Sequence, residues 1–115
     1  MNEPWRALLS PKERLARSRL RKLLNEPGIL RASLIHMKRR CGNPSCRCAS
    51  AKRYWHLSWY IGQSNSGRRR MKFLPEALVP EVESWIECYR EVHSLLNEVS
   101  SENWNKIVRR TKRPR

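Results

Sequence analysis

Apolar residues near the start of the chain recur at helical spacing over residues 10–26. Ser10 can act as an N-cap and Pro11 suits the first helical position, while Pro27-Gly28 ends the pattern. An amphipathic helix is therefore predicted. Its apolar side carries Ala16, Leu20, Leu23 and Leu24, and its basic side carries Arg14, Arg17 and Arg21. That basic side is interpreted equally well as a solvated surface or as a phosphate-contacting one.

Three short segments then predict antiparallel strands. Residues 33–39 have a strand-like composition, residues 53–61 alternate between apolar and polar positions, and residues 68–74 alternate again. Met71 and Phe73 are assigned to the core, and residues 62–67 to a polar turn. One face of the middle strand would carry Trp55, Leu57, Trp59 and Ile61. The outward face would carry Tyr54, His56, Ser58 and Tyr60 beside Arg68, Arg70 and Lys72.

The helical pattern returns over residues 75–108, with Pro80 near its start, and residues 109–115 form a basic tail predicted to be disordered. We therefore expect an α+β fold in one small domain over residues 1–108. It would combine a basic N-terminal helix over residues 10–26, a three-stranded antiparallel sheet with a Cys-rich zinc knuckle over residues 29–74, and a long amphipathic C-terminal helix.

The net charge of +15 over 115 residues bears on the function of the chain. Residues 1–72 hold 18 lysines and arginines against three glutamates, residues 73–102 are acidic, and residues 103–115 are basic. Such segregation favours binding to a polyanion, with DNA ahead of RNA. The residues predicted to contact nucleic acid are Arg14, Arg17, Arg21, Arg39, Arg40, Arg47, Lys52, Arg53, Tyr54, Tyr60, Arg68, Arg69, Arg70, Lys72, Arg109 and Arg110.

Three cysteines stand within eight residues at Cys41, Cys46 and Cys48. No apolar run reaches the roughly 18 residues of a membrane span, and the N-terminus lacks a signal-peptide pattern, so a cytoplasmic protein with reduced thiols is expected. Close cysteines then favour a structural zinc ion over a disulfide or an iron–sulfur cluster. Zinc needs a fourth ligand, for which His56 is the first candidate. The alternatives are His36, Cys88 and His93.

Catalysis is not expected, because the chain has no aspartate, no nucleotide-binding glycine loop and no paired carboxylates outside one helical glutamate run. Two other functions stay open. One is a redox or metal-transfer protein. The other is a protein-interaction adaptor or homodimer that uses the long helix, with contacts from Val82, Trp85, Ile86, Tyr89, Val92 and Leu96.

Residues 29–100 resemble a family of short prokaryotic proteins catalogued as a domain of unknown function. The resemblance is carried by a Cys-Gly-x-Pro-x-Cys-x-Cys-Ala loop, an aromatic strand where members have a Tyr-rich one, and a Pro-Glu-x-Leu-Val helix start. In this chain these are Cys41–Ala49, Tyr54–Trp59 and Pro75–Val79. The resemblance implies that the three cysteines act as a unit and that members lie near mobile elements. It implies no established activity. The chain departs from the pattern at Ala32, where members have Gly, and at Ala51-Lys52-Arg53, where they often have His-Gly-Pro.

Overall fold

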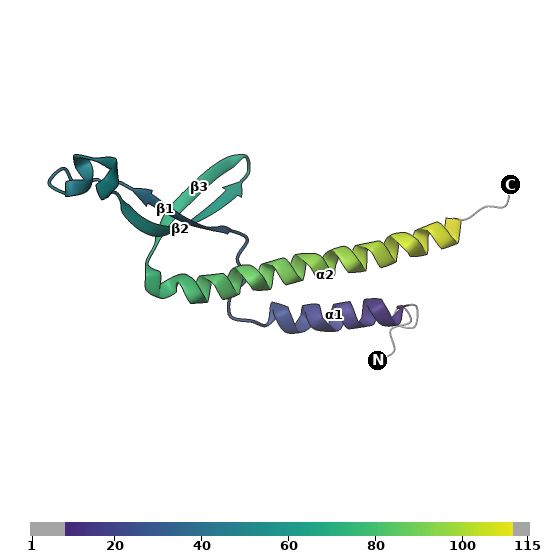
Figure 1. Cartoon of the computed structure of the whole chain (residues 1–115). Coiled ribbons are helices and arrows are strands. Elements are labelled where there is room, and N and C mark those ends of the chain that lie inside the picture. The colour runs from purple at the N-terminus through teal and green to yellow at the C-terminus, as the bar shows by residue number, and fades with distance from the viewer. Residues whose placement is uncertain (1–8, 112–115) are drawn as a thin grey trace. The chain divides into compact units, whose positions relative to one another are not determined.

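The structure is a computed structural model that describes residues 9–111 (Figure 1). It confirms the predicted α+β fold: an N-terminal helix, a three-stranded antiparallel sheet and a long C-terminal helix. Its helices are α1 (Pro11–Leu24) and α2 (Val79–Thr111), and its strands are β1 (Ser33–Arg39), β2 (His56–Asn65) and β3 (Arg68–Leu74). Short 3₁₀ turns are η2 (Arg47–Ala49), η3 (Lys52–Tyr54) and η4 (Glu76–Leu78).

The chain divides into two compact units, which we describe separately. The helical unit comprises α1 and the later part of α2, in described residues 9–29 and 87–111. The sheet unit comprises residues 30–86, with the three strands and the first turns of α2. No helix in the described part of the chain has an apolar stretch long enough to cross a bilayer.

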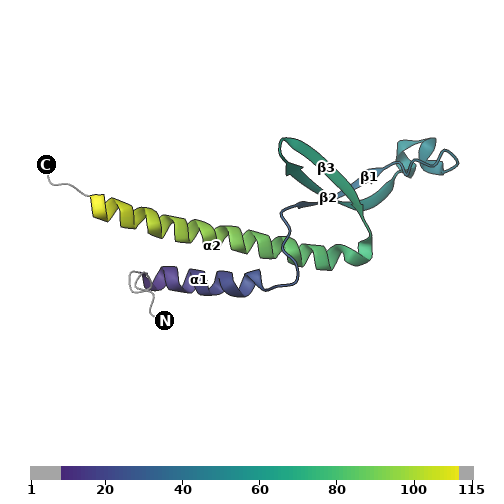
Figure 2. The ribbon, with the colours of Figure 1, turned by 180° about the vertical axis from the view of Figure 1, so that it is seen from behind.

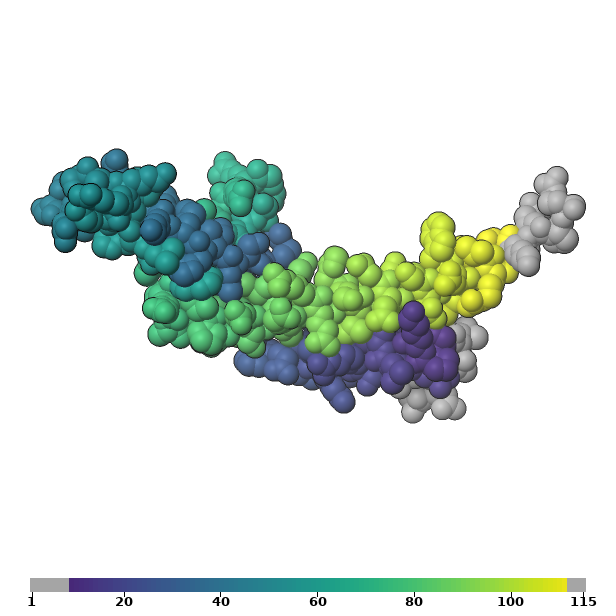
Figure 3. Space-filling model, in the orientation of Figure 1, coloured from purple at the N-terminus to yellow at the C-terminus, as the bar shows by residue number. Residues whose placement is uncertain are grey.

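In the helical unit, α1 lies along the later part of α2 (Figure 3). Its core consists of Ala16, Leu20, Leu23, Cys88, Val92 and Val99, with Leu95 packed against them. The predicted apolar side of α1 is correct for three of its four residues. Leu24 is 60% exposed and lies outside the core that the other three residues form with α2.

The first turn of α1 is tied to the last turns of α2. Ser10 is the N-cap, since its Oγ accepts a hydrogen bond from the Glu13 backbone N–H at 3.1 Å and donates one to Glu102 Oε1 at 2.6 Å. The Glu13 carboxylate is fully buried and accepts hydrogen bonds from Arg17 Nε at 2.8 Å and Lys106 Nζ at 2.7 Å. Through Lys106, Glu13 therefore links α1 to α2, and it is also the acidic residue in the first turn of α1.

The sheet unit has strand order β1-β2-β3, with both pairs antiparallel (Figure 2). One face of the sheet packs against the first turns of α2. This core contains Leu74, Val82 and Ile86, with Leu30, Ala32, Leu34, Trp59, Ile61 and Val79 around them. The core face is thus the predicted Trp59 and Ile61 side of β2, which fixes the direction of every other side chain in the sheet.

The assignment of Met71 and Phe73 to the core is wrong. Trp59 pairs with Leu74, so Leu74 shares the core face and is 5% exposed. Phe73 pairs with Tyr60 on the other face and is 56% exposed. Because side chains alternate along a strand, a shift of one position transfers the whole set to the opposite face.

The predicted six-residue turn is also too long, because β2 runs through Gly62 to Asn65. Only Ser66 and Gly67 lie between paired residues Asn65 and Arg68, and both have positive φ, at 53° and 79°. Two positive φ angles match a type I′ hairpin turn, whose twist suits the flanking strands. Gly62 serves packing instead, since a Cβ there would lie 2.9 Å from Cδ1 of Ile35.

Two segment ends differ from the expectation. β2 begins at His56, so Tyr54 lies in η3 and not on the strand. α2 begins after η4 and continues to Thr111, so residues 109–111 are helical where disorder was predicted. Basic side chains favour the negative end of the helix dipole, and Thr111 Oγ1 donates to the Ile107 carbonyl at 2.7 Å. The rest of the predicted tail, residues 112–115, lies outside the described residues.

Candidate metal centre

The β1–β2 hairpin brings the predicted metal ligands together. Its last pair joins Arg39 to His56, so Cys41, two residues beyond β1, emerges beside the first residue of β2. Antiparallel pairing of the strands therefore brings residues 41 and 56 close together without any contribution from a metal ion.

Local turns then fold the loop of residues 41–48, here called the Cys loop, back on itself. Gly42 has a φ of +88°, which favours glycine. Asn43 accepts hydrogen bonds from the Ser45 N–H through its side chain and from the Cys46 N–H through its carbonyl, at 2.9 and 3.0 Å. Cys46 then precedes η2, which contains Cys48. These turns bring three sulfurs to one side of the loop.

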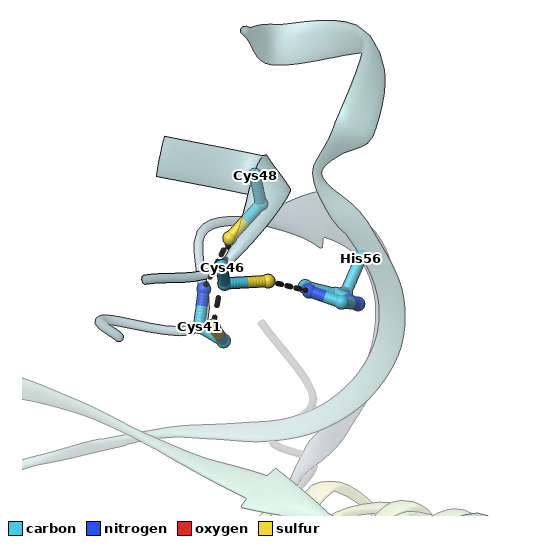
Figure 4. A group of neighbouring side chains, drawn as sticks. All are labelled: Cys41, Cys46, Cys48 and His56. Carbon is cyan, nitrogen blue, oxygen red and sulfur yellow. Dashed lines mark hydrogen bonds between the residues drawn. The ribbon is translucent and has the colours of Figure 1, made fainter. Parts of the chain in front are cut away.

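Four ligand atoms converge at this point (Figure 4). The three sulfurs and one imidazole nitrogen all lie within 4.8 Å of one another. Cys41 Sγ is 3.5 Å from Cys48 Sγ, and Cys46 Sγ is 3.3 Å from His56 Nε2. All the thiols are free. Cys41, Cys46, Cys48 and His56 could therefore coordinate a metal ion.

The thiols differ in their readiness to ionise. The pKa of Cys46 is lowered to about 6, first by the backbone N–H of Cys48, and then by His56 and the neighbouring thiols. The backbone N–H of Cys41 donates to Cys48 Sγ at 3.4 Å and acts to lower the pKa of Cys48, but burial and the other two thiols prevail and raise it. A cation among the sulfurs would favour the thiolate of all three.

The other candidates for the fourth ligand lie elsewhere. His36 stacks on Trp59 with ring centroids 4.0 Å apart and planes 4° apart. Cys88 is buried in the helical core, where its thiol donates to the Leu23 carbonyl at 3.5 Å. His93 stacks on Tyr89 in the same unit. The group of four found among the described residues contains His56 and none of these.

Aromatic rings around the Cys loop hold basic side chains in place. The guanidinium groups of Arg47 and Arg53 lie 4.3 and 4.8 Å from the centre of the Tyr54 ring. Arg40 and Lys52 lie 5.7 and 5.5 Å from the Trp55 ring. These are cation–π distances, so the rings order positive charge next to the candidate metal centre.

The sheet and the Cys loop contain no carboxylate with which to neutralise that charge. Residues 30–75 include 11 lysines and arginines and no aspartate or glutamate. The basic side of α1 differs, because Arg17 is bound to Glu13 while Arg14 and Arg21 are exposed. Arg109 and Arg110 lie in the last turn of α2.

The prediction that Tyr60 and the basic residues Arg68, Arg70 and Lys72 share one face of the sheet is wrong. Arg68, Arg70 and Lys72 pair with Asn65, Gln63 and Ile61, so they lie on the face opposite Tyr60. Arg70 Nε donates to Gln63 Oε1 at 2.9 Å on that side. The residues that do share a face with Tyr60 are Ser33, Ile35, Met37, Arg39, His56, Ser58, Ser64, Arg69, Met71 and Phe73. We call this set the open face.

Sequence reasoning missed Phe73 and Met71 as surface residues. Counting back from a two-residue turn at Ser66-Gly67 pairs Leu74 with Trp59 and would have found them. Three of the six residues considered for a partner surface, Val82, Ile86 and Val92, lie in the chain's own cores.

Comparison with known proteins gives a family and no activity. No curated protein and no solved structure matches the chain. Residues 11–84 match the family described as a domain of unknown function (DUF6788). That match begins at α1 and includes the Cys loop and the whole sheet. Since it spans more than half of the sequence, the chain belongs to this family of domains of unknown function.

Proposed function

We propose that the chain is a nucleic-acid-binding protein whose sheet unit is held together by a structural zinc ion. The observation that carries the binding proposal is the charge of residues 30–75, with 11 basic side chains and no carboxylate. A surface of one sign attracts phosphate without internal competition. Aromatic rings that already order Arg40, Arg47 and Arg53 reduce the entropy lost when these groups bind.

Zinc is supported by the identity and the spacing of the ligands. Three cysteines and a histidine form a common structural zinc set, and tetrahedral zinc places such ligand atoms about 3.5–3.8 Å apart. The two contacts at 3.5 and 3.3 Å are close to that spacing. Four protein ligands would complete the coordination of the ion and leave no position for a substrate, which favours a structural role over a catalytic one.

The binding proposal is tested by titrating the protein against a duplex oligonucleotide at several salt concentrations. If 6–10 basic groups contact phosphate, affinity should fall roughly 10³–10⁵-fold between about 50 and 200 mM salt. Arg39→Gln with Arg40→Gln should weaken binding and lower the salt slope by about 1–2. The matched double variant Arg14→Gln with Arg21→Gln, in α1, should change the affinity and the salt slope less. Absence of binding to duplex and to single strands at low salt would overturn the proposal.

Metal analysis of the purified protein tests the zinc proposal. We expect one zinc ion per chain, lost on Cys46→Ala and retained on Cys88→Ala, since Cys88 is a core residue. A protein that holds no zinc and forms a reversible disulfide among its thiols would support the redox alternative.

The adaptor or homodimer alternative keeps one supporting observation. Leu96, Trp104 and Ile107 on α2 are 52%, 70% and 54% exposed, which is high for large apolar side chains. Sedimentation at several protein concentrations distinguishes the adaptor or homodimer from a nucleic-acid-binding monomer. A dimer that persists on dilution and lacks nucleic-acid affinity would favour the adaptor.

A further inference from the structure

The open face is unusually apolar for a solvated sheet surface. The first turns of α2 cover the other face, and no element of the sheet unit covers this one. An antiparallel sheet with one solvated face normally presents polar residues there. Here Phe73 and Met71 are 56% and 42% exposed, and Ile35 extends over Gly62 in the neighbouring strand.

Two aromatic rings and one arginine form the centre of the open face. Tyr60 and Phe73 pair across β2 and β3, with ring centroids 5.9 Å apart and planes at 77°. The Arg39 guanidinium lies 5.4 Å from the Tyr60 ring centre, and its Nη1 is 3.6 Å from Met71 Sδ. This combination offers a planar ligand both a stacking surface and a positive charge.

A hollow of about 520 Å³ lies between the open face and the Cys loop. Its volume is within the range of roughly 300–1,000 Å³ that is usual for small-ligand sites. Its lining includes Arg39, Arg40, Ser58, Tyr60 and Phe73, together with three of the candidate metal ligands, Cys41, Cys46 and His56. It therefore has an aromatic wall and a positively charged rim, contains no aspartate or glutamate, and borders the candidate metal centre.

These features select among nucleic acids. A paired base inside a duplex is stacked on both faces and cannot offer a face to a protein ring, whereas an unpaired base can. The rim charge suits the phosphates on either side of such a base. We propose that the protein binds single-stranded nucleic acid and that one unpaired base enters this hollow against Phe73 and Tyr60. This inference rests on the proposed nucleic-acid-binding function.

The experiment compares three fluorescent probes at one moderate salt concentration: a single strand of about a dozen nucleotides, its duplex, and the same strand with abasic sites. DNA and RNA versions of the single strand are both used. We expect the intact strand to bind more tightly than the duplex. The abasic strand, which keeps its phosphates and loses its bases, should bind more weakly than the intact strand.

Phe73→Leu is the decisive variant. Loss of one stacked base should weaken binding of the intact strand by about 5- to 150-fold and leave duplex binding unchanged. Leu57→Ala is the matched control, because Leu57 is similarly exposed, at 57%, on the same sheet but the opposite face. Phe73→Trp keeps a ring at the position and should retain the affinity. Equal metal content and circular dichroism spectra show whether the variants are folded.

The outcomes separate this inference from the function on which it rests. Equal affinity for strand and duplex, with no effect of Phe73→Leu, overturns the base-binding hollow and leaves phosphate-led nucleic-acid binding in place. An equal effect of Phe73→Leu and Leu57→Ala also overturns it, since the loss would then not depend on the open face. Absence of binding to all three probes at low salt overturns both proposals.

Discussion

In the helical unit, basic side chains lie beside glutamates, as in the pairs Arg17–Glu13, Arg19–Glu91 and Lys106–Glu13, with N–O distances of 2.7–2.8 Å. In the sheet unit, residues 30–75 carry 11 basic side chains and no carboxylate. Arg19–Glu91 and Lys106–Glu13 join the two helices, and Arg17–Glu13 lies within α1. The basic side chains of residues 30–75 have no carboxylate among them to pair with. Net charge alone does not distinguish these two arrangements, because the positions of the glutamates decide between them.

The units should also depend on different forces, and metal removal is the strongest test. Structural zinc contributes an apparent free energy of about 10–16 kcal/mol, which equals or exceeds the stability of a typical domain. Chelation should therefore abolish hydrogen-exchange protection in β1–β3 while α1 and the later part of α2 keep theirs. Protection that is retained in the strands after metal loss, or lost equally in both units, would contradict the comparison.

A core truncation in the helical unit should have the reverse effect. Leu20→Ala removes a side chain that is 9% exposed, which should lower the free energy of unfolding of that unit by about 2–4 kcal/mol. Metal content should not change. Leu15→Ala, at a site 73% exposed, is the control and should cost less than about 0.5 kcal/mol. Thermal melts of metal-loaded protein would measure both.

The buried carboxylate of Glu13 makes the internal charge pairing dependent on pH. Burial acts to raise its pKa, but hydrogen bonds from Lys106 and Arg17 outweigh burial, so the pKa lies below its ordinary value of 4.5. The folded state then holds fewer protons than the unfolded state, and the stabilisation is complete above about pH 4.5 and lost as pH falls through the folded pKa.

Glu13→Gln should accordingly lower the free energy of unfolding by about 1–3 kcal/mol at neutral pH and flatten its decline in acid. Denaturant titrations at a series of pH values would show this. Glu26→Gln, at an exposed position of the same unit, should do neither. An equal response of the two variants would show that the Glu13 pairs contribute nothing specific.

The smallest effect is expected at the β2–β3 turn. Ser66 has a φ of 53°, where a residue with a Cβ is strained, so Ser66→Gly should gain a few tenths of a kcal/mol, and less than about 1 kcal/mol. Comparing the gain with and without metal would show whether the turn and the proposed metal ion stabilise the sheet independently. A loss of stability would indicate that the Ser66 side chain makes a contact that outweighs the strain.

Element types were predictable because spacing determines them, whereas side-chain faces depend on register. The sequence indicated all three strands, yet Phe73 was placed in the core because it is one of the apolar positions of an alternating strand, whereas the pairing of Trp59 with Leu74 puts it on the opposite face. The Cys loop was predictable from spacing alone. The sequence offered His56 as the first of four candidates for the fourth ligand. What brings it to the cysteines is its pairing with Arg39, a contact across 17 positions of the chain that no local pattern encodes.

The basic side chains of β3 have a consequence for solubility. The sheet has strand order β1-β2-β3, so β1 and β3 are edge strands with backbone groups free to pair with another sheet. β3 carries Arg68, Arg69, Arg70 and Lys72 along its length. Two such edges would bring like charges together, so edge-to-edge aggregation is opposed by repulsion. The residues that we propose to bind a polyanion would thus also oppose association of the free protein with its own copies.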